Sequence, residues 1–226
     1  MIRFKDVSKI YNHRSIALED INLRIKSKEF VCLAGPSGAG KTTLLRLLIA
    51  EECPTKGEVW LGKLNINKLR SKHMPYLRRR IGMIFQDFKL LSNKNAYENI
   101  AFAMEVWGVD DKEIKKDVFQ VLELVGLQDK ADHFPYQLSG GEKQRIAIAR
   151  ALIHRPEIII ADEPTGNLDS VNTWEIINLL NKINELGTTV VLATHDRDVI
   201  NNLKKRVIVI EKGKVVSDEE GGKYIN

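Results

Sequence analysis

A glycine-rich stretch near the N-terminus constrains this chain more than any other feature. Residues 35–43 read Gly-Pro-Ser-Gly-Ala-Gly-Lys-Thr-Thr, which matches the pattern of Gly, four residues, Gly, Lys and Thr. The apolar run 30–34 before it predicts a buried strand, and the leucine-rich run 44–48 after it predicts a helix. A strand, a loop and a helix in this order form the context in which such a pattern binds phosphate.

The residue types in this loop suit a triphosphate with Mg²⁺. The glycines let the backbone turn sharply and point several N–H groups at one place, and the helix start adds its dipole. Lys41 supplies a full positive charge, the Thr42 hydroxyl can bind Mg²⁺, and Thr43 can bond an inner phosphate. A glycine-rich turn without a ligand would not explain the Gly-Lys-Thr run. The residues expected to contact the triphosphate are Gly35, Pro36, Ser37, Gly38, Ala39, Gly40, Lys41, Thr42 and Thr43.

A second glycine-rich sequence, at 138–144, precedes another predicted helix. Ser139 and Glu142 stand at the spacing of a capping box, which starts helices for structural reasons alone. A capping box does not need Gly140 and Gly141, and each glycine costs about 1 kcal/mol relative to Ala in a helix interior. Because glycines leave the backbone N–H groups open to an anion, we favour a second phosphate-binding element.

Acidic residues follow the apolar run 158–161, which predicts a buried parallel strand. Asp162 and Glu163 would repel each other there unless a cation or a catalytic task held them. We predict that Asp162 binds Mg²⁺, directly or through water, and that Glu163 is the general base. The reverse assignment and a purely structural turn stay as alternatives. His195 follows another apolar run, 188–193, where it can bond the terminal phosphate or the water.

Two other polar side chains are ambiguous from sequence alone. Tyr11 lies in a polar connection, where an aromatic residue either packs on the surface or stacks on a purine ring. Gln86 ends the predicted strand 81–85, and its side-chain oxygen can bind a cation or a water. A lone Gln at a strand end is ordinarily polar surface, so these roles need outside support.

The pattern of elements predicts an α/β fold, a P-loop NTPase core in one domain of 226 residues. The strict alternation of apolar and polar residues at 21–25 predicts an N-terminal antiparallel β subdomain. We expect residues 1–86 and 157–226 to form the core and residues 87–156 to form a helical insertion bearing the sequence at 138–144. The polar residues 217–226 predict a short surface tail.

Composition excludes several classes. No apolar run approaches the length of a membrane span, and the N-terminus lacks a secretory signal, so we expect a cytoplasmic protein. The formal net charge of +5 comes without a basic stripe interleaved with aromatics, which argues against nucleic acid. The basic residues of 63–80 predict a solvated face, with contact to an anionic surface as the alternative. Cys32 and Cys53 are too few for a disulfide framework, and we expect both to be reduced and structural.

Taken in order, these motifs resemble the ATP-binding cassette (ABC) ATPases over nearly the full length of the chain. The resemblance implies that Tyr11 stacks on adenine, that Gln86 contacts Mg²⁺ and a transmembrane partner, and that His195 senses the γ-phosphate. It also implies an ATP-dependent homodimer in which residues 139–141 complete the site of the opposite protomer, with Asp169 at the interface. The expected metal ligands are Thr42, Gln86 and Asp162, and the expected catalytic residues are Lys41, Glu163 and His195.

Within that family, the segments 1–4, 77–88, 134–135 and 217–224 resemble a bacterial cell-division branch. This implies a Mg²⁺-dependent ATPase subunit, peripheral on the cytoplasmic face of the inner membrane, that acts through an integral membrane protein on cell-wall hydrolysis. The stretch 161–169 is shared with lipoprotein-export and macrolide-export branches, so an exporter ATPase is the alternative.

A third possibility is a soluble regulatory cassette without a membrane partner, although such relatives usually carry two cassettes in one chain. Two places depart from the common family pattern. Residues 50–53 read Ala-Glu-Glu-Cys where relatives usually carry a Gly, and Asn95 stands where a Thr is common.

Overall fold

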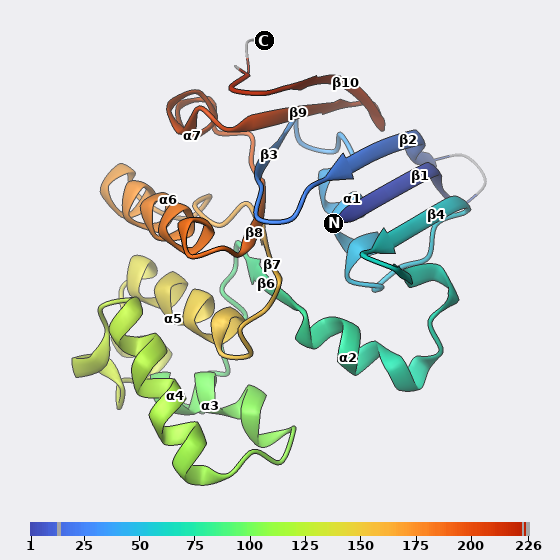
Figure 1. Ribbon diagram of the computed structural model, residues 1–226. Helices are drawn as coiled ribbons and strands as arrows, with labels where there is room; N and C mark the ends of the chain where they lie inside the picture. Colours follow the sequence, from blue (N-terminus) through green and yellow to red (C-terminus); the bar gives the residue numbers. More distant parts are fainter. Residues whose placement is uncertain (13–14, 223, 225–226) are drawn as a thin grey trace. The chain divides into compact units, whose positions relative to one another are not determined.

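The computed structural model describes residues 1–12, 15–222 and 224, and the chain divides into two compact units (Figure 1). Unit 1 contains Met1–Arg78 and Asn184–Asn226, and unit 2 contains Arg79–Ile183. The mixture of parallel strands, antiparallel strands and helices confirms the predicted α/β class. The predicted boundaries of the helical insertion do not coincide with these units and stay a prediction.

An antiparallel sheet opens unit 1, as the alternating sequence predicts. In β2, Ile21, Leu23 and Ile25 are buried while Asn22 and Arg24 are exposed, because successive side chains of a strand point to opposite faces. The strands follow the order β2-β1-β4-β5. Their bounds are β1 Ile2–Tyr11, β2 Ser15–Ile25, β4 Lys56–Leu61 and β5 Leu64–Asn65.

A second set of strands in unit 1 is centred on β3, which pairs in parallel with β8 and β9. All five residues of β3 and of β8 are buried, in agreement with their continuous apolar sequences. Cys32 lies in β3, where burial raises the pKa of its thiol to about 12, whereas Cys53 is exposed. The bounds are β3 Phe30–Ala34, β8 Thr189–Ala193, β9 Arg206–Glu211 and the antiparallel β10 Lys214–Glu219.

The helices of unit 1 follow these strands. The prediction of a polar tail from residue 217 is wrong in part, because β10 continues to Glu219 and Tyr224 is buried, with its backbone N–H bonded to Asn201 Oδ1 at 2.9 Å. The basic stretch after β5 contains only short helices. The helices are α1 Lys41–Leu48, η1 Ile66–Lys68, η2 Ser71–His73, α2 Met74–Arg79, which ends in unit 2, and α7 Arg197–Leu203.

Unit 2 is mostly helical around one parallel strand pair, β6 and β7. Two of its helices are α3 and α4, and Asp110 caps α4 by accepting from the Lys112 N–H at 2.9 Å. None of the helices among the described residues is long and apolar enough to cross a membrane. The bounds are β6 Ile81–Phe85, α3 Ala96–Glu105, α4 Asp111–Leu124, η3 Gln128–Lys130, η4 Pro135–Gln137, α5 Gly140–Leu152, β7 Ile158–Asp162 and α6 Ser170–Glu185, which ends in unit 1.

Candidate active site

The predicted phosphate loop connects β3 to α1 in unit 1. Gly35, Gly38 and Gly40 all have positive φ, at 146°, 76° and 110°, a region that other residues adopt only with strain. At Gly35 the need is also steric, because a Cβ would lie 2.1 Å from the Ile210 backbone oxygen. The sequence therefore folds into the sharp turn that the motif predicts.

Lys41 lies at the start of α1 with a side chain that is largely buried. Its Nζ donates to the backbone oxygens of Gly35, at 2.6 Å, and Pro36, at 3.2 Å. The ammonium group is thus held beside the loop backbone, at the end of the helix where the dipole favours an anion. Thr42, the next residue, is exposed and can present its hydroxyl to a ligand.

His195 and Tyr11 lie in the same unit as the phosphate loop. The Thr194 N–H donates to Leu33 O at 3.1 Å, so the exposed His195 follows β8 at the edge where β3 ends. Tyr11 ends β1, where burial and a hydrogen bond to Glu52 raise its pKa, and Lys9 Nζ lies 4.9 Å from its ring centroid. Stacking of adenine on this ring stays a prediction.

The predicted metal ligand Asp162 ends β7 in unit 2, and the predicted general base Glu163 follows it. Phe85 of β6 is opposite Asp162 of β7 in the parallel register, so Gln86 and Glu163 leave the two strands at one edge. Glu163 has φ of 49°, a left-handed conformation that costs a residue with a Cβ roughly 1–2 kcal/mol. Such strain often occurs at functional sites, where it is part of how a side chain is aimed.

The signature residues 138–144 start α5, and the structure contains the complete capping box. Ser139 Oγ accepts from the Glu142 N–H at 3.2 Å, and Glu142 Oε2 accepts from the Ser139 N–H at 2.8 Å. The Ser139 N–H and its side chain lower the pKa of Glu142 despite partial burial, with Lys130 and Arg145 nearby. The capping box predicted from this spacing is therefore present, and anion binding would be a second role of the same residues.

The two signature glycines also have a packing role. A Cβ at Gly141 would lie 1.9 Å from Asn172 Oδ1, and a Cβ at Gly140 would lie 3.2 Å from Leu168 Cδ2. The turn before α6 thus approaches the start of α5 closely. In that turn Asp169 accepts from the Asn172 backbone N–H at 2.9 Å and from its side chain at 2.6 Å, which lowers the pKa of Asp169.

Sequence reasoning missed two residues of α5 that hold the segment around Gln86. Gln144 is fully buried and donates to Phe85 O at 3.4 Å, while its Oε1 has no hydrogen-bond partner among the described residues. Arg150 donates to Phe88 O at 2.8 Å, and burial lowers the pKa of its guanidinium. The signal available in the sequence was a polar residue at a helix position where the pattern predicts burial.

The residues predicted to bind metal fit Mg²⁺ by their chemistry. Thr42, Gln86 and Asp162 offer a hydroxyl, an amide oxygen and a carboxylate, and Mg²⁺ prefers oxygen ligands completed by water and phosphate. Within residues 1–12, 15–222 and 224, no three His, Cys, Asp or Glu side chains form a group that could hold a metal ion alone. Because the three predicted ligands are all oxygens, the set suits an ion that nucleotide phosphate also binds.

Comparison with known proteins decides the family. A family model described as ABC transporter matches residues 18–166. The chain belongs to this family. Its similarity to "Cell division ATP-binding protein FtsE" from Bacillus subtilis is 49% identity over 224 residues, covering 99% of this chain and 98% of the relative. The protein of the same name from Streptococcus pneumoniae D39 is 50% identical over 224 residues, covering 99% and 97%.

A solved ABC structure extends the comparison. The ATP-binding cassette MJ0796, as a dimer in a post-hydrolysis state bound to ADP and Pi, is 37% identical, with a TM-score of 0.87 over 99% of this chain and 100% of that chain. The present protein is an ABC ATPase of the FtsE type that binds ATP. The predicted family, fold and enzyme class are confirmed.

The two departures from the common ABC pattern have structural explanations. Within residues 50–53, where relatives usually carry a Gly, Ala50 has φ of 52° and so adopts a conformation that glycine would adopt without strain. Asn95 caps α3, accepting from the Glu98 N–H at 2.8 Å, while Glu98 Oε2 accepts from the Asn95 N–H at 2.8 Å. Thr and Asn both serve as N-caps, so this departure preserves the helix start.

Proposed function

We propose that this ABC ATPase hydrolyses Mg²⁺-ATP, dimerises on ATP and acts on an FtsX-like integral membrane protein to control cell-wall hydrolysis during cell division. The observation that carries the proposal is the complete set of nucleotide motifs in a chain about half identical to FtsE proteins over its whole length. The protein would then be peripheral on the cytoplasmic face of the inner membrane, held there by its partner.

In this proposal each residue keeps the role that its chemistry suits. The phosphate loop binds the triphosphate, Tyr11 stacks on adenine, and Asp162 holds Mg²⁺ directly or through water. Glu163 takes the proton of the attacking water, and His195 bonds the terminal phosphate. Mg²⁺ supplies charge stabilisation for the transferring phosphoryl group.

Replacement of Glu163 by Gln tests the assignment of the base. We expect Glu163→Gln to bind ATP normally and to release phosphate at least about 100-fold more slowly, because general-base catalysis contributes roughly 10²- to 10⁴-fold. Glu123→Gln, an exposed change on α4, is the matched control. Hydrolysis by Glu163→Gln at the parental rate would show that the base is another group.

The dimer is the second part of the proposal. Ser139, Gly140 and Gly141 would contact the ATP held by the opposite protomer, with Asp169 at the interface. In the slow Glu163→Gln background, ATP should shift the molar mass measured by light scattering to that of a dimer, and Ser139→Arg should prevent the shift. A Ser139→Arg variant that still dimerises on ATP would contradict this arrangement.

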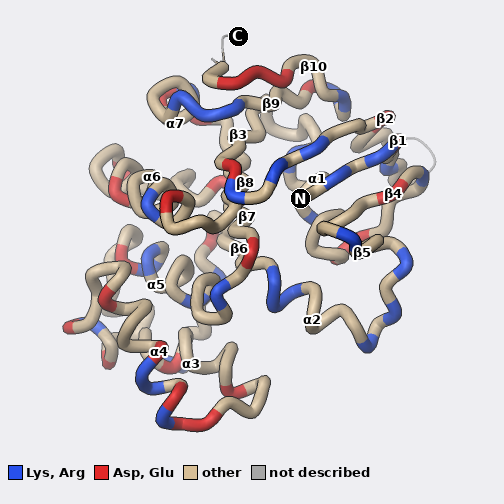
Figure 2. Tube along the Cα trace, in the orientation of Figure 1, with Lys and Arg blue, Asp and Glu red and all other residues tan. Residues whose placement is uncertain are grey.

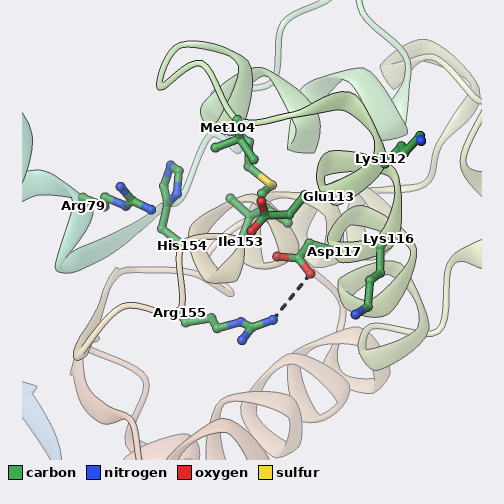
Figure 3. A pocket seen from close by; sticks show the side chains of 10 residues that line it. Arg79, Met104, Lys112, Glu113, Lys116, Asp117, Ile153, His154 and Arg155 are labelled. Atoms are coloured by element: carbon green, nitrogen blue, oxygen red, sulfur yellow. Dashed lines mark hydrogen bonds and ion pairs between the residues drawn. The ribbon is translucent and has the colours of Figure 1, made fainter.

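A pocket of about 520 Å³ in unit 2 supports contact with the membrane partner (Figure 3). Its lining combines the buried Met104 and Ile153 with the half-buried His154, while Arg155 pairs with Asp117 at 3.4 Å. Three further cations line this pocket beside the carboxylates of Glu113 and Asp117, so we propose that it receives a cytoplasmic segment of the partner that carries carboxylates. These cations are Arg79, Lys112 and Lys116.

The pocket and the signature lie at opposite ends of one helix. Ile153 immediately follows α5, and Ser139 immediately precedes it, about 20 Å away at 1.5 Å per residue. A segment seated in the pocket would therefore act on the signature through a single rigid element. The basic residues of 63–78 are mostly exposed and add an anion-attracting surface in unit 1 (Figure 2).

Purification from membranes in detergent tests the partner. Recovery of an FtsX-like protein with the tagged chain, reduced by Lys112→Glu together with Lys116→Glu, is the expected result. Recovery of a lipoprotein or small-molecule exporter in its place would favour the export ATPase, whose branch shares the stretch 161–169.

A further inference from the structure

The side chain of Gln86 is paired with that of Asn167 in the turn before α6. Gln86 Nε2 donates to Asn167 Oδ1 at 3.3 Å, and Asn167 Nδ2 donates to the Gln86 backbone oxygen at 3.2 Å. The two hydrogen bonds close a ring between residues 81 positions apart in the sequence. Because this ring uses the NH₂ group of Gln86, the side-chain oxygen Oε1 is the atom directed to other ligands.

The residue before Asn167 leaves room for this pairing. A Cβ at Gly166 would lie 2.7 Å from Gln86 Nε2 and 3.1 Å from Gln86 Cδ, so any side chain at 166 would push the amide aside. The backbone around Gln86 is held separately, by Gln144 at Phe85 O. The turn at 166–167 therefore acts on the orientation of the Gln86 side chain.

We infer that Asn167 is a positioning residue for Gln86, fixing the amide so that Oε1 is presented to Mg²⁺. An amide rotated by half a turn would present its NH₂ group, which repels a cation. The inference rests on the proposed function, in which Gln86 is a metal ligand. Residues that orient a metal ligand typically change metal affinity 10- to 100-fold when they are removed.

Binding of Mn²⁺, followed by the electron paramagnetic resonance of the free ion, tests this role without relying on hydrolysis. The Glu163→Gln variant is loaded with ATP, and the Mn²⁺ dissociation constant is measured with and without Asn167→Ala. We expect Asn167→Ala to raise it about tenfold. Gly166→Ala should act in the same direction, because it displaces the same amide. Asn202→Ala, which removes an exposed Asn side chain on α7, should change nothing.

A mutant cycle separates positioning from general damage. In a Gln86→Ala background, Asn167→Ala should have no further effect on the Mn²⁺ dissociation constant, since there is no side chain to orient. The inference would be overturned if Asn167→Ala had an equal effect in both backgrounds. It would also be overturned if Asn167→Ala left the Mn²⁺ dissociation constant unchanged in the chain that retains Gln86. If Asn167→Ala fails to fold by circular dichroism, Asn167→Ser serves in the same cycle with the same expectations. Failure of the parental chain to bind or hydrolyse ATP would instead count against the proposed function.

Discussion

Two glycine-rich turns start helices in this chain, and the N-termini of these two helices differ in how they are capped. Gly40 precedes α1 in a left-handed conformation, with no side-chain cap and no acidic residue in the first turn. Ser139 precedes α5 with a full capping box, and Glu142 places a carboxylate in the first turn. The first helix start favours an outside anion, whereas the second is already bonded by its own side chains.

The glycines of the two turns therefore meet different physical requirements. Around Gly35 and Gly40 the glycines satisfy backbone conformations that a side chain would strain. At Gly141 the glycine admits a neighbouring turn, since Asn172 lies against it. The phosphate loop is therefore organised for an anion within one chain. The start of α5 is organised as a capped helix, and its contact with phosphate is part of the proposed dimer.

The largest effect is expected at the first loop glycine. Gly35→Ala should lower the free energy of unfolding by about 3 kcal/mol, because it combines an unfavourable φ with a Cβ placed against the Ile210 carbonyl. Urea denaturation measures the change, with Gly38→Ala, where a Cβ meets no atom within 4 Å, as the control for φ alone. Equal losses in the two variants would remove the steric part of the argument.

The next effect separates the lysines in the first turns of the two helices. Lys41→Ala should weaken ATP binding between about 10- and 100-fold, as expected for loss of a charge-assisted hydrogen bond of roughly 1.5–3 kcal/mol. Lys143→Ala, at the start of α5, should leave ATP binding by the isolated protomer unchanged. Titration calorimetry at a concentration where the protein is monomeric makes the comparison. A similar loss for Lys143→Ala would mean that the signature binds ATP within its own chain.

A smaller effect should follow from filling the signature glycine. Gly141→Ala should destabilise the protein by about 1–2 kcal/mol, since the added Cβ overlaps the Asn172 side chain. Because that side chain can be shortened, Asn172→Ala should recover at least half of the loss in the double variant. Denaturation of the two single variants and the double variant provides the measurement. No recovery would indicate that the strain at 141 comes from the backbone, as at Gly35.

The smallest effect concerns the capping box and its pH dependence. Ser139→Ala should cost about 1 kcal/mol of unfolding free energy. The pKa of Glu142 is lowered in the folded protein, so its contribution is present above the unfolded value of about 4.3 and is lost as the pH falls through the folded pKa. The stability difference between the parent and Glu142→Gln should therefore be constant at neutral pH and shrink below about pH 4.3. A difference that does not change with acidification would show that the cap does not depend on the charge.

The local features of this protein follow from short stretches of its sequence. The spacing of Ser139 and Glu142 is that of one helical turn, so their mutual hydrogen bonds follow from the chain alone. The glycines around Lys41 likewise specify the phosphate loop, and the apolar runs before the loop and before Asp162 specify buried strands. Such features depend on neighbours within a few residues, which a linear pattern records.

Contacts between distant segments become visible in the folded chain. The pairing of Gln86 with Asn167, the contact of Gly141 with Asn172 and the bonds of Arg150 to the segment after Gln86 join residues tens of positions apart. These contacts depend on strand neighbours and helix packing, so no local pattern predicts them. For the same reason, the packing of the start of α5 against the turn before α6 could not be predicted from the sequence.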